Sequence, residues 1–179
     1  MFRRSFLAAA AASTFLPRAA RAGSAHDFVL PSIDGGDIAL ADWRGRPILV
    51  VNTASLCGFT PQLEALQALH ERYGPEGVLV LGVPSNDFRQ ELATAEEVHE
   101  FCAVNYAITF PMTEILQVRG RGAHPLYAWM AESADVRPRW NFTKVLIGPD
   151  GRVARSWGSA TRPLGREITG ALDAMLAAG

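Results

Sequence analysis

The sequence predicts an α/β fold, a three-layer sandwich that begins with a β-hairpin. Two continuous apolar runs, residues 47–51 and 78–83, are rich in β-branched side chains and are typical of strands buried on both faces. Between them, apolar residues recur at helical spacing over 63–73. Glycine-containing turn sequences at 34–36 and 149–151 predict one hairpin near each end of the chain. The parallel unit in the middle and the hairpins beside it define the fold class.

The first half of the chain supplies the hairpin and the parallel unit. Residues 27–30 and 37–40 flank the first turn, and 47–51 form the first central strand. The following helix is amphipathic and ends at Gly74-Pro75, where proline cannot continue it. The strand at 78–83 then closes a right-handed parallel β-α-β unit.

The second half alternates helices with a second hairpin. Thr94-Ala-Glu-Glu97 is a capping box, and the helix after it has an apolar stripe that includes Cys102. His124-Pro starts another helical stretch, and His124 is interpreted as a helix-start or packing residue. Strands at 142–147 and 153–157 pair antiparallel, and a last amphipathic helix spans 166–176. This order of elements is that of a thioredoxin-like sandwich.

Residues 1–22 differ from the rest and are interpreted as an export signal. Arg3-Arg4 resembles a twin-arginine signal, and the apolar stretch that follows it to Leu16 is too short to span a bilayer. Ala20-Arg21-Ala22 is a small-x-small cleavage pattern, so the expected mature domain is 23–179 and its expected location is the bacterial periplasm. The alternative for this segment is a retained N-terminal anchor or a frayed helix.

Charge and composition exclude several classes of partner. Residues 1–22 hold four arginines and no acid, so 23–179 keep 13 of the 17 basic residues against all 18 acidic ones, a net charge of −5. This balance argues against binding to nucleic acid or to an anionic membrane surface. The four histidines have no ligand spacing, and no metal is expected. Cys57 and Cys102 are the two cysteines; without a Cys-x-x-Cys motif, dithiol exchange within one motif is excluded.

Cys57 is the candidate nucleophile. It follows the first central strand, and Thr60-Pro61 after it is a helix-start signal, with Thr60 expected as the N-cap. Unpaired backbone N–H groups at a helix N-terminus favour an anion, so the thiolate of Cys57 is expected to be stabilised. The alternative is an inert buried cysteine.

Several motifs give the chain a resemblance to a known family. The sequence resembles the glutathione peroxidase family, in particular its cysteine-containing bacterial branch, over nearly all of residues 23–179. The most specific stretches are Asn52-Thr-Ala-Ser-Leu-Cys-Gly-Phe-Thr-Pro61 and Trp140-Asn-Phe-Thr-Lys144. The others are Leu81-Gly-Val-Pro-Ser-Asn86, Gln90-Glu91, Phe110-Pro-Met112 and His124-Pro-Leu-Tyr127.

The resemblance implies a thioredoxin-like fold and reduction of hydrogen peroxide or of organic and lipid hydroperoxides. It implies Cys57 as the peroxidatic residue and Gln90, Trp140 and Asn141 as its partners. These three side chains offer N–H donors that do not titrate, as a thiolate and a departing oxygen require. The reductant implied is a thioredoxin-like protein or a low-molecular-weight thiol such as glutathione, and no cofactor is implied. The short segment between Trp129 and Trp140 lacks the insertion of the tetrameric relatives, so a monomer or weak dimer is expected.

The chain departs from the family pattern at two places. The family usually has Asn-Gln-Phe-Gly-x-Gln-Glu, whereas Asn86-Asp-Phe-Arg-Gln90 is one residue shorter and lacks the glycine. Gln90 is kept in the site, and Asp87 is expected to be a solvated loop residue. Cys102 falls one residue before the position of the family's resolving cysteine, a rotation of about 100° on a helix. Resolving and structural roles for Cys102 therefore both stay open.

Two other function classes were compared with the peroxidase hypothesis. A peroxiredoxin would carry Pro-x-x-x-Thr-x-x-Cys, which is not present around Cys57. A non-catalytic thioredoxin-fold binding or chaperone protein would hold Cys57 and Cys102 in a permanent disulfide. The state of these two thiols distinguishes the second class from the peroxidase.

Overall fold

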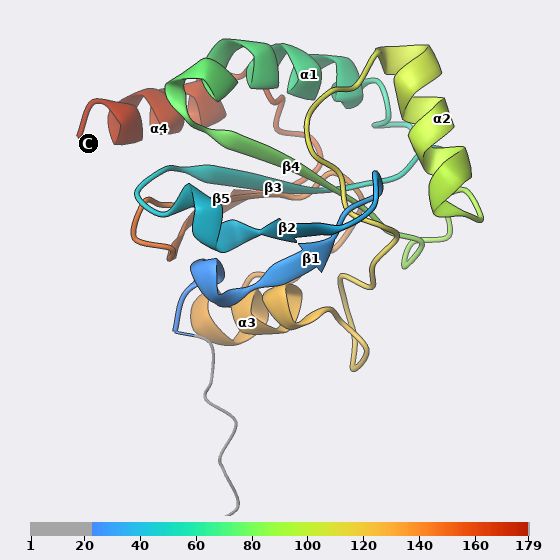
Figure 1. Ribbon diagram of the computed structural model, residues 1–179, viewed down its shortest axis with the longest axis horizontal. Coiled ribbons are helices and arrows are strands. Elements are labelled where there is room, and N and C mark those ends of the chain that lie inside the picture. Colours follow the sequence, from blue (N-terminus) through green and yellow to red (C-terminus); the bar gives the residue numbers. More distant parts are fainter. Residues whose placement is uncertain (1–22, 179) are drawn as a thin grey trace, which may run out of the picture.

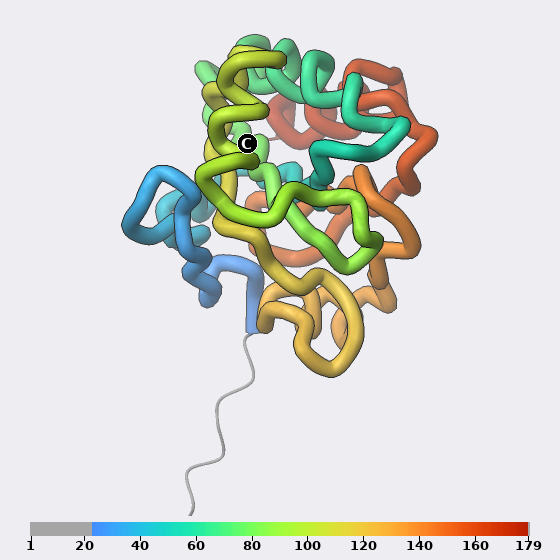
Figure 2. The backbone as a smooth tube through the Cα atoms, turned by 90° about the vertical axis from the view of Figure 1, so that its right-hand side faces the viewer, coloured from blue at the N-terminus to red at the C-terminus, as the bar shows by residue number. Residues whose placement is uncertain are grey.

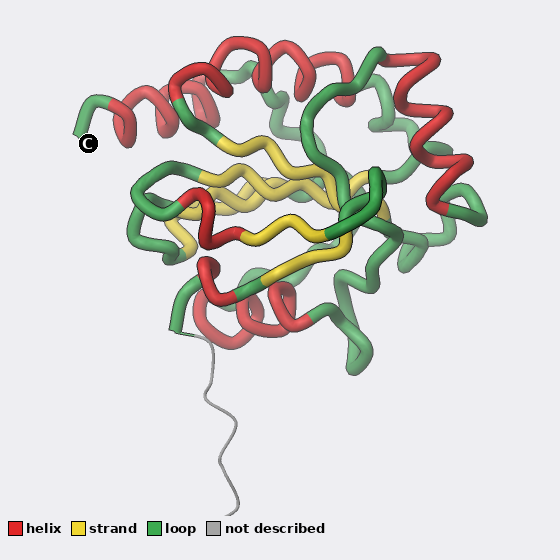
Figure 3. Tube along the Cα trace, in the orientation of Figure 1, coloured by secondary structure: helices red, strands yellow, loops and turns green. Residues whose placement is uncertain are grey.

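A four-stranded mixed sheet forms the centre of the molecule. The computed structural model describes residues 23–178, and the interpretation of 1–22 as an export signal lies outside the described residues. The strand order is β4 (Leu79–Pro84), β3 (Ile48–Thr53), β5 (Lys144–Ile147) and β6 (Val153–Trp157). β3 is parallel to β4 and antiparallel to β5, and β5 is antiparallel to β6. Figure 3 shows the strands in yellow at the centre of the molecule. The parallel unit and the second hairpin are thus confirmed.

Helices cover both faces of this sheet, which gives three layers (Figure 1). The helices α1 (Gln62–Tyr73) and α4 (Arg166–Leu176) lie on one face, and α3 (Pro125–Ala134) lies on the other. The hairpin of β1 (Val29–Pro31) and β2 (Asp37–Ala39) lies on the α3 side, as a separate two-stranded sheet. The remaining helix, α2 (Ala95–Tyr106), flanks α1. Short 3-10 turns complete the chain at Ala25–Asp27, Leu40–Trp43 and Gly74–Glu76.

Every residue of β3 and β4 is buried, as the continuous apolar runs predict. Leu49 and Val51 pack in the core shared with α1 and α4, whereas Ile48 and Val50 pack in the core shared with α3 and the hairpin. This alternation follows from the two-residue period of a strand. A strand with both faces covered by helices must be apolar on both.

The carboxyl ends of β3 and β4 meet at one edge of the sheet. They are in register, with Thr53 opposite Pro84. Figure 2, which looks onto the right-hand side of Figure 1, shows the loops that leave these strands. Functional residues of open α/β sheets collect at this edge. The loop with Cys57 and the loop with Gln90 are therefore neighbours.

Most predicted elements are confirmed, and one strand begins later than expected. The capping box at the start of α2 and the bounds of α4 are as expected. The strand expected from residue 142 begins only at Lys144, because Phe142 adopts a positive φ of 60° that no strand accommodates. Within residues 23–178, no helix combines the length and the apolar character needed to cross a bilayer.

Candidate active site

The loop that carries Cys57 is held by Thr60. The Thr60 hydroxyl lies 2.8 Å from the carbonyl oxygen of Ala54 and 2.7 Å from that of Cys57, and it accepts a 3.1 Å hydrogen bond from the Cys57 N–H. The expectation that Thr60 is the N-cap of α1 is wrong. The helix begins at Gln62, and Pro61 occupies the cap position. Because the Thr60 hydroxyl is turned back to the loop, it fixes the cysteine rather than the helix.

The sulfur of Cys57 lies just before α1, as the sequence indicates. The N–H of Phe59 donates to Cys57 Sγ at 3.4 Å, and the cysteine is 8% exposed. This backbone N–H points at the sulfur, and the N-terminus of α1 follows three residues later in the chain. The side chain is thus mostly covered and has one oriented donor.

Gln90 and Asn141 are brought together at this loop. The side-chain N–H₂ of Asn141 donates to the side-chain carbonyl oxygen of Gln90 at 2.9 Å. The N–H of Leu56 donates to the backbone carbonyl of Gln90, also at 2.9 Å, which ties Gln90 to the residue before Cys57. Asn141 is fully buried, and its Oδ1 has no partner within the described part of the chain.

Trp140 directly precedes Asn141 and lies at the protein surface. Its ring packs against Phe88 with the ring centres 5.3 Å apart, and the side chain is 42% exposed. Its backbone carbonyl accepts a 3.2 Å hydrogen bond from Asn52 Nδ2, and Asn52 Oδ1 accepts from the Thr143 N–H at 3.1 Å. Asn52 at the end of β3 thus holds the turn that presents Trp140 and Asn141.

The shortened loop before Gln90 keeps the turn without its glycine. Arg89 takes the left-handed conformation with φ of 58°, which glycine adopts most easily. The carboxylate of Asp87 accepts from the N–H groups of Val118 at 2.6 Å and Arg119 at 3.0 Å. The expectation that Asp87 is a solvated loop residue is wrong, because its side chain fastens this loop to the segment before α3.

Glu91 is a residue whose place sequence reasoning missed. Its side chain is buried, and Oε1 accepts 2.9 Å hydrogen bonds from the N–H groups of Ser55 and Leu92. Oε2 is buried without a partner among the described residues. Burial raises the pKa of Glu91 above its ordinary value, against the opposing effect of these hydrogen bonds. Its position directly after Gln90, in a stretch that contributes to the family resemblance, was the available signal.

Lys144 and Ser159 form a second support that the sequence alone did not identify. Lys144 is 0% exposed, and its ammonium group donates to Gln62 Oε1 at 2.5 Å and to the Ser159 carbonyl at 3.0 Å. The Ser159 hydroxyl donates to the Asn141 carbonyl at 2.5 Å. Burial lowers the pKa of Lys144 to about 8. A single lysine inside an apolar strand was the signal for this buried charge.

Cys102 lies on α2, in the same hydrophobic core cluster as Cys57. It is 3% exposed in the core beneath α1, and burial, followed by the charge of Glu91, raises the pKa of its thiol to about 12. Cys57 and Cys102 are both free in the structure. Cys102 is thus a buried thiol that packs in the core.

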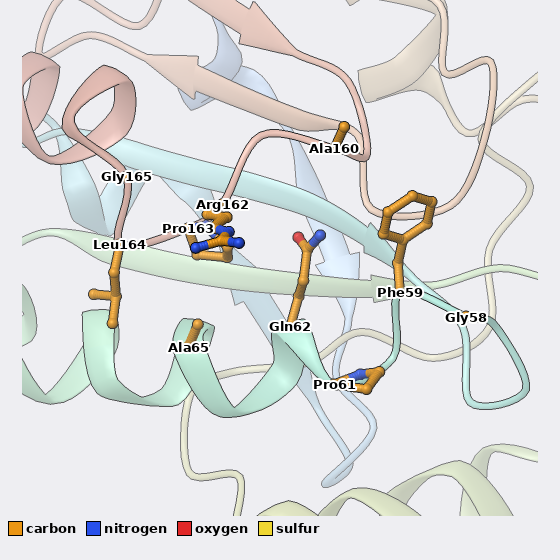
Figure 4. A pocket seen from close by; sticks show the side chains of 10 residues that line it. All are labelled: Gly58, Phe59, Pro61, Gln62, Ala65, Ala160, Arg162, Pro163, Leu164 and Gly165. Carbon is orange, nitrogen blue, oxygen red and sulfur yellow. The ribbon is translucent and has the colours of Figure 1, made fainter.

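A groove runs beside the cysteine loop (Figure 4). It has a volume of about 780 Å³ and lies between the start of α1, with Pro61 and Ala65, and the loop with Ala160 to Gly165. Gly58 and Phe59, which directly follow Cys57, line its end. Its other side chains are mostly apolar, and Arg162 supplies the charge. The lining thus offers a mainly apolar surface next to the cysteine loop.

Among residues 23–178, no three His, Cys, Asp or Glu side chains come together as metal ligands. His124 caps α3: its Nδ1 accepts from the Leu126 N–H at 3.3 Å, and burial lowers its pKa. The interpretation of His124 as a helix-start residue is confirmed.

Solved structures of other proteins share this fold. The chain is 33% identical to a crystal structure described as Trgpx in apo form, with a TM-score of 0.70 over 87% of this chain and 97% of that one. A thioredoxin family protein from Chlorobium tepidum TLS, 14% identical, has a TM-score of 0.64 over 83% of this chain and 92% of its own. The second similarity supports the fold alone and confirms the thioredoxin-like architecture.

Relatives and a family model also match the chain at the level of sequence. The chain is 41% identical over 143 residues to a glutathione peroxidase of Lactococcus lactis, which covers 77% of this chain and 91% of that protein. It is 40% identical over 151 residues to a hydroperoxy fatty acid reductase of Synechocystis, covering 77% and 88%. The family model described as glutathione peroxidase matches residues 25–131, which include Cys57 and Gln90 and stop before Trp140. With these matches, the chain belongs to the glutathione peroxidase family.

Proposed function

We propose that this family member is a thiol-dependent peroxidase in which Cys57 is the nucleophile. The observation that carries the proposal is the position of the Cys57 sulfur, 3.4 Å from the Phe59 N–H at the start of α1. The loop of Cys57 is joined to Gln90, and Gln90 is joined to Asn141. The loop of the thiol is thus tied to two neutral amide side chains, the kind of donor that stabilises a developing oxyanion.

The reaction has two halves. The Cys57 thiolate attacks one oxygen of the hydroperoxide, the O–O bond breaks, and the other oxygen leaves with a proton as water or an alcohol. The sulfur becomes a sulfenic acid and has lost two electrons to the peroxide. A second thiol then attacks this sulfur, a disulfide forms, and the sulfenic oxygen leaves as water. Trp140, Gln90 and Asn141 donate to the oxygen that develops negative charge.

The substrates are hydrogen peroxide and organic hydroperoxides, including those of lipids. The mostly apolar groove beside Gly58 and Phe59 supports the larger substrates, because it offers an apolar chain a surface next to the nucleophile. The relative from Synechocystis is named for a hydroperoxy fatty acid substrate. The reductant is a thioredoxin-like protein or a small thiol such as glutathione.

The role of Cys102 depends on which thiol attacks the Cys57 sulfenic acid in the second half-reaction. If it attacks the Cys57 sulfenic acid, α2 must open locally, because Cys102 is buried and its thiol ionises only at high pH. If it does not, the second thiol comes from the reductant directly. The alternative function, a binding protein with a permanent Cys57–Cys102 disulfide, is not favoured, because both thiols are free and the relatives are named as enzymes.

Intact mass after one equivalent of hydrogen peroxide tests the proposal. Wild type is compared with Cys57→Ser, Cys102→Ala and Trp140→Phe. We expect no peroxide consumption by Cys57→Ser and a slower reaction of Trp140→Phe. A loss of two hydrogens in wild type, with a gain of one oxygen in Cys102→Ala, makes Cys102 the resolving thiol. A gain of one oxygen in both proteins makes the second thiol external. Wild-type peroxide consumption by Cys57→Ser refutes the proposal.

The proposal extends to location and assembly. The arginine pair, the apolar stretch and the small-x-small pattern of residues 1–22 support export to the periplasm and cleavage after Ala22. The short segment between Trp129 and Trp140 supports a monomer or weak dimer. Expression of the full chain in a bacterium, with N-terminal sequencing of the periplasmic fraction, is expected to give Gly23 first. Light scattering on that material measures the oligomeric state. A stable tetramer contradicts the prediction of a monomer or weak dimer.

A further inference from the structure

A second cavity lies on the α3 side of the molecule and shares no lining residue with the groove beside Cys57. It measures about 370 Å³, within the range of small-molecule sites. Its walls come from the segment before α3, from one side of α3 and from the chain just after that helix. Most of the lining is apolar: Val118, Ala123, Tyr127, Ala128, Ala131 and Val136.

Three arginines complete the lining of this cavity. Arg119, Arg121 and Arg137 are all exposed. Arg137 forms an ion pair with Asp135, and the Arg119 guanidinium lies 5.1 Å from the centre of the Phe88 ring. Since residues 23–179 carry a net charge of −5, a cavity lined by three arginines and no acid contrasts with the charge of the chain. Such a concentration of guanidinium groups attracts anions.

Tyr127 adds a polar group that the fold does not satisfy. It is 2% exposed, and its hydroxyl has no hydrogen-bond partner within residues 23–178. Burial raises the pKa of this phenol, so it stays a neutral donor. A buried hydroxyl without a partner is destabilising, because it has lost its hydrogen bonds to water. An acceptor oxygen in the cavity that this side chain lines would remove that cost once the lining adjusts around it.

The combination of walls and charges defines the chemistry of an occupant. Six apolar residues favour a hydrocarbon body, whereas guanidinium groups pair with carboxylates through two parallel hydrogen bonds. We propose that this cavity is a binding site for a single-chain fatty carboxylate. Its alkyl chain lies against α3, and its carboxylate pairs with Arg121 and Arg119. In this arrangement the carboxylate competes with the Phe88 ring for the Arg119 guanidinium.

Calorimetric titration of the folded protein with dodecanoate, kept below its micelle concentration, tests the proposal. Two matched probes separate the two contributions to binding: dodecanol keeps the chain without the charge, and acetate keeps the charge without the chain. We expect one saturable site for dodecanoate and binding at least about tenfold weaker for either control compound, which corresponds to about 1.4 kcal/mol.

Variants with matched controls locate the site. Arg121→Glu reverses a charge in the lining, and Arg152→Glu makes the same change on the β5–β6 turn, away from this cavity. Ala131→Phe fills the cavity, and Ala134→Phe places the same ring at the end of α3, outside the lining. We expect the first member of each pair to weaken dodecanoate binding about tenfold or more and the second to leave it unchanged.

Three results would overturn the proposal. Equal binding of dodecanol shows that the arginines are not used. Equal loss in both members of a pair places the binding elsewhere. Absence of saturable binding to wild type removes the site altogether. Thermal unfolding of each variant confirms the fold, and because the two pairs alter different features, one unfolded variant still leaves the other pair to decide.

Discussion

The side-chain amide of Asn141 donates a 2.9 Å hydrogen bond to the side-chain carbonyl of Gln90, although the two residues are 51 positions apart. This bond joins the loop after β4 to the turn before β5. Gln90 is in turn held through its backbone carbonyl by the N–H of Leu56, next to Cys57. The three segments that carry the candidate active site are therefore joined through Gln90.

If this amide pair acts as a unit, its two members are coupled energetically. We expect Gln90→Ala and Asn141→Ala each to slow the reaction of Cys57 with hydrogen peroxide by about a hundredfold, as loss of an oxyanion donor does. Because each substitution also releases the partner, the double variant should be only slightly slower than either single variant. Stopped-flow rates of wild type, the two single variants and the double variant measure this coupling. Additive losses, about ten-thousandfold in the double variant, would show that the two amides act independently.

Lys144 should give the protein a pH dependence of stability at alkaline pH. Burial lowers its pKa from 10.5 to about 8. Between these values the unfolded chain holds a proton that the folded protein has released, so the contribution of Lys144 to the free energy of unfolding rises with pH. At one pKa unit per about 1.4 kcal/mol, wild type should gain on the order of a few kcal/mol relative to Lys144→Met across this window.

Urea unfolding of wild type and Lys144→Met at both ends of the window measures this difference. Below the folded pKa the amine is charged in both states, so the difference between the two proteins should be flat there. Gln62→Met removes one acceptor of the ammonium group and keeps the charge, and it serves as the control. A difference that does not change with pH would show that Lys144 titrates as it does in the unfolded chain.

Glu91 should tolerate loss of its charge but not loss of its acceptor oxygen. Its Oε1 accepts from the N–H groups of Ser55 and Leu92, and burial raises its pKa. The folded protein therefore holds this proton to higher pH than the unfolded chain, and the associated stability is lost as pH rises through the folded pKa. Glu91→Gln keeps the acceptor without the charge, so at neutral pH we expect stability within about 1 kcal/mol of wild type, or above it.

Glu91→Leu is the contrasting variant, because it leaves two N–H groups without their acceptor. We expect it to lower the free energy of unfolding by about 2 kcal/mol or more. Chemical denaturation at neutral pH compares the three proteins. If Glu91→Gln proved as destabilising as Glu91→Leu, the ionised carboxylate rather than the neutral acceptor would be the stabilising group.

The two cysteines should differ sharply toward an alkylating agent. The Cys57 sulfur has a backbone donor and lies at a loop, whereas Cys102 is buried and its thiol has a pKa of about 12. We expect iodoacetamide at neutral pH to modify only Cys57 in the folded protein and both thiols after unfolding. Mass spectrometry of digested protein identifies the sites, with Cys57→Ser as the control. Equal labelling of Cys102 in the folded protein would show that α2 opens readily.

The sequence by itself determined the layers and the place of the nucleophile. Continuous apolar runs must be strands covered on both faces, and strands at 48–53 and 79–84 are fully buried. Leucines at helical spacing between them required a crossover helix, so Cys57 had to lie at the carboxyl edge before a helix N-terminus. These are local patterns, and local patterns are readable in one chain.

The tertiary structure decided which polar groups meet. Thr60 carries a good capping side chain, yet its hydroxyl binds the carbonyl groups of Ala54 and Cys57, which only the folded loop brings within reach. Lys144 meets Gln62 across 82 residues, and Asn141 meets Gln90 across 51. Such hydrogen bonds depend on the register of β3, β4 and β5 and on where each loop returns. Neither the period of apolar residues nor a turn sequence contains that information.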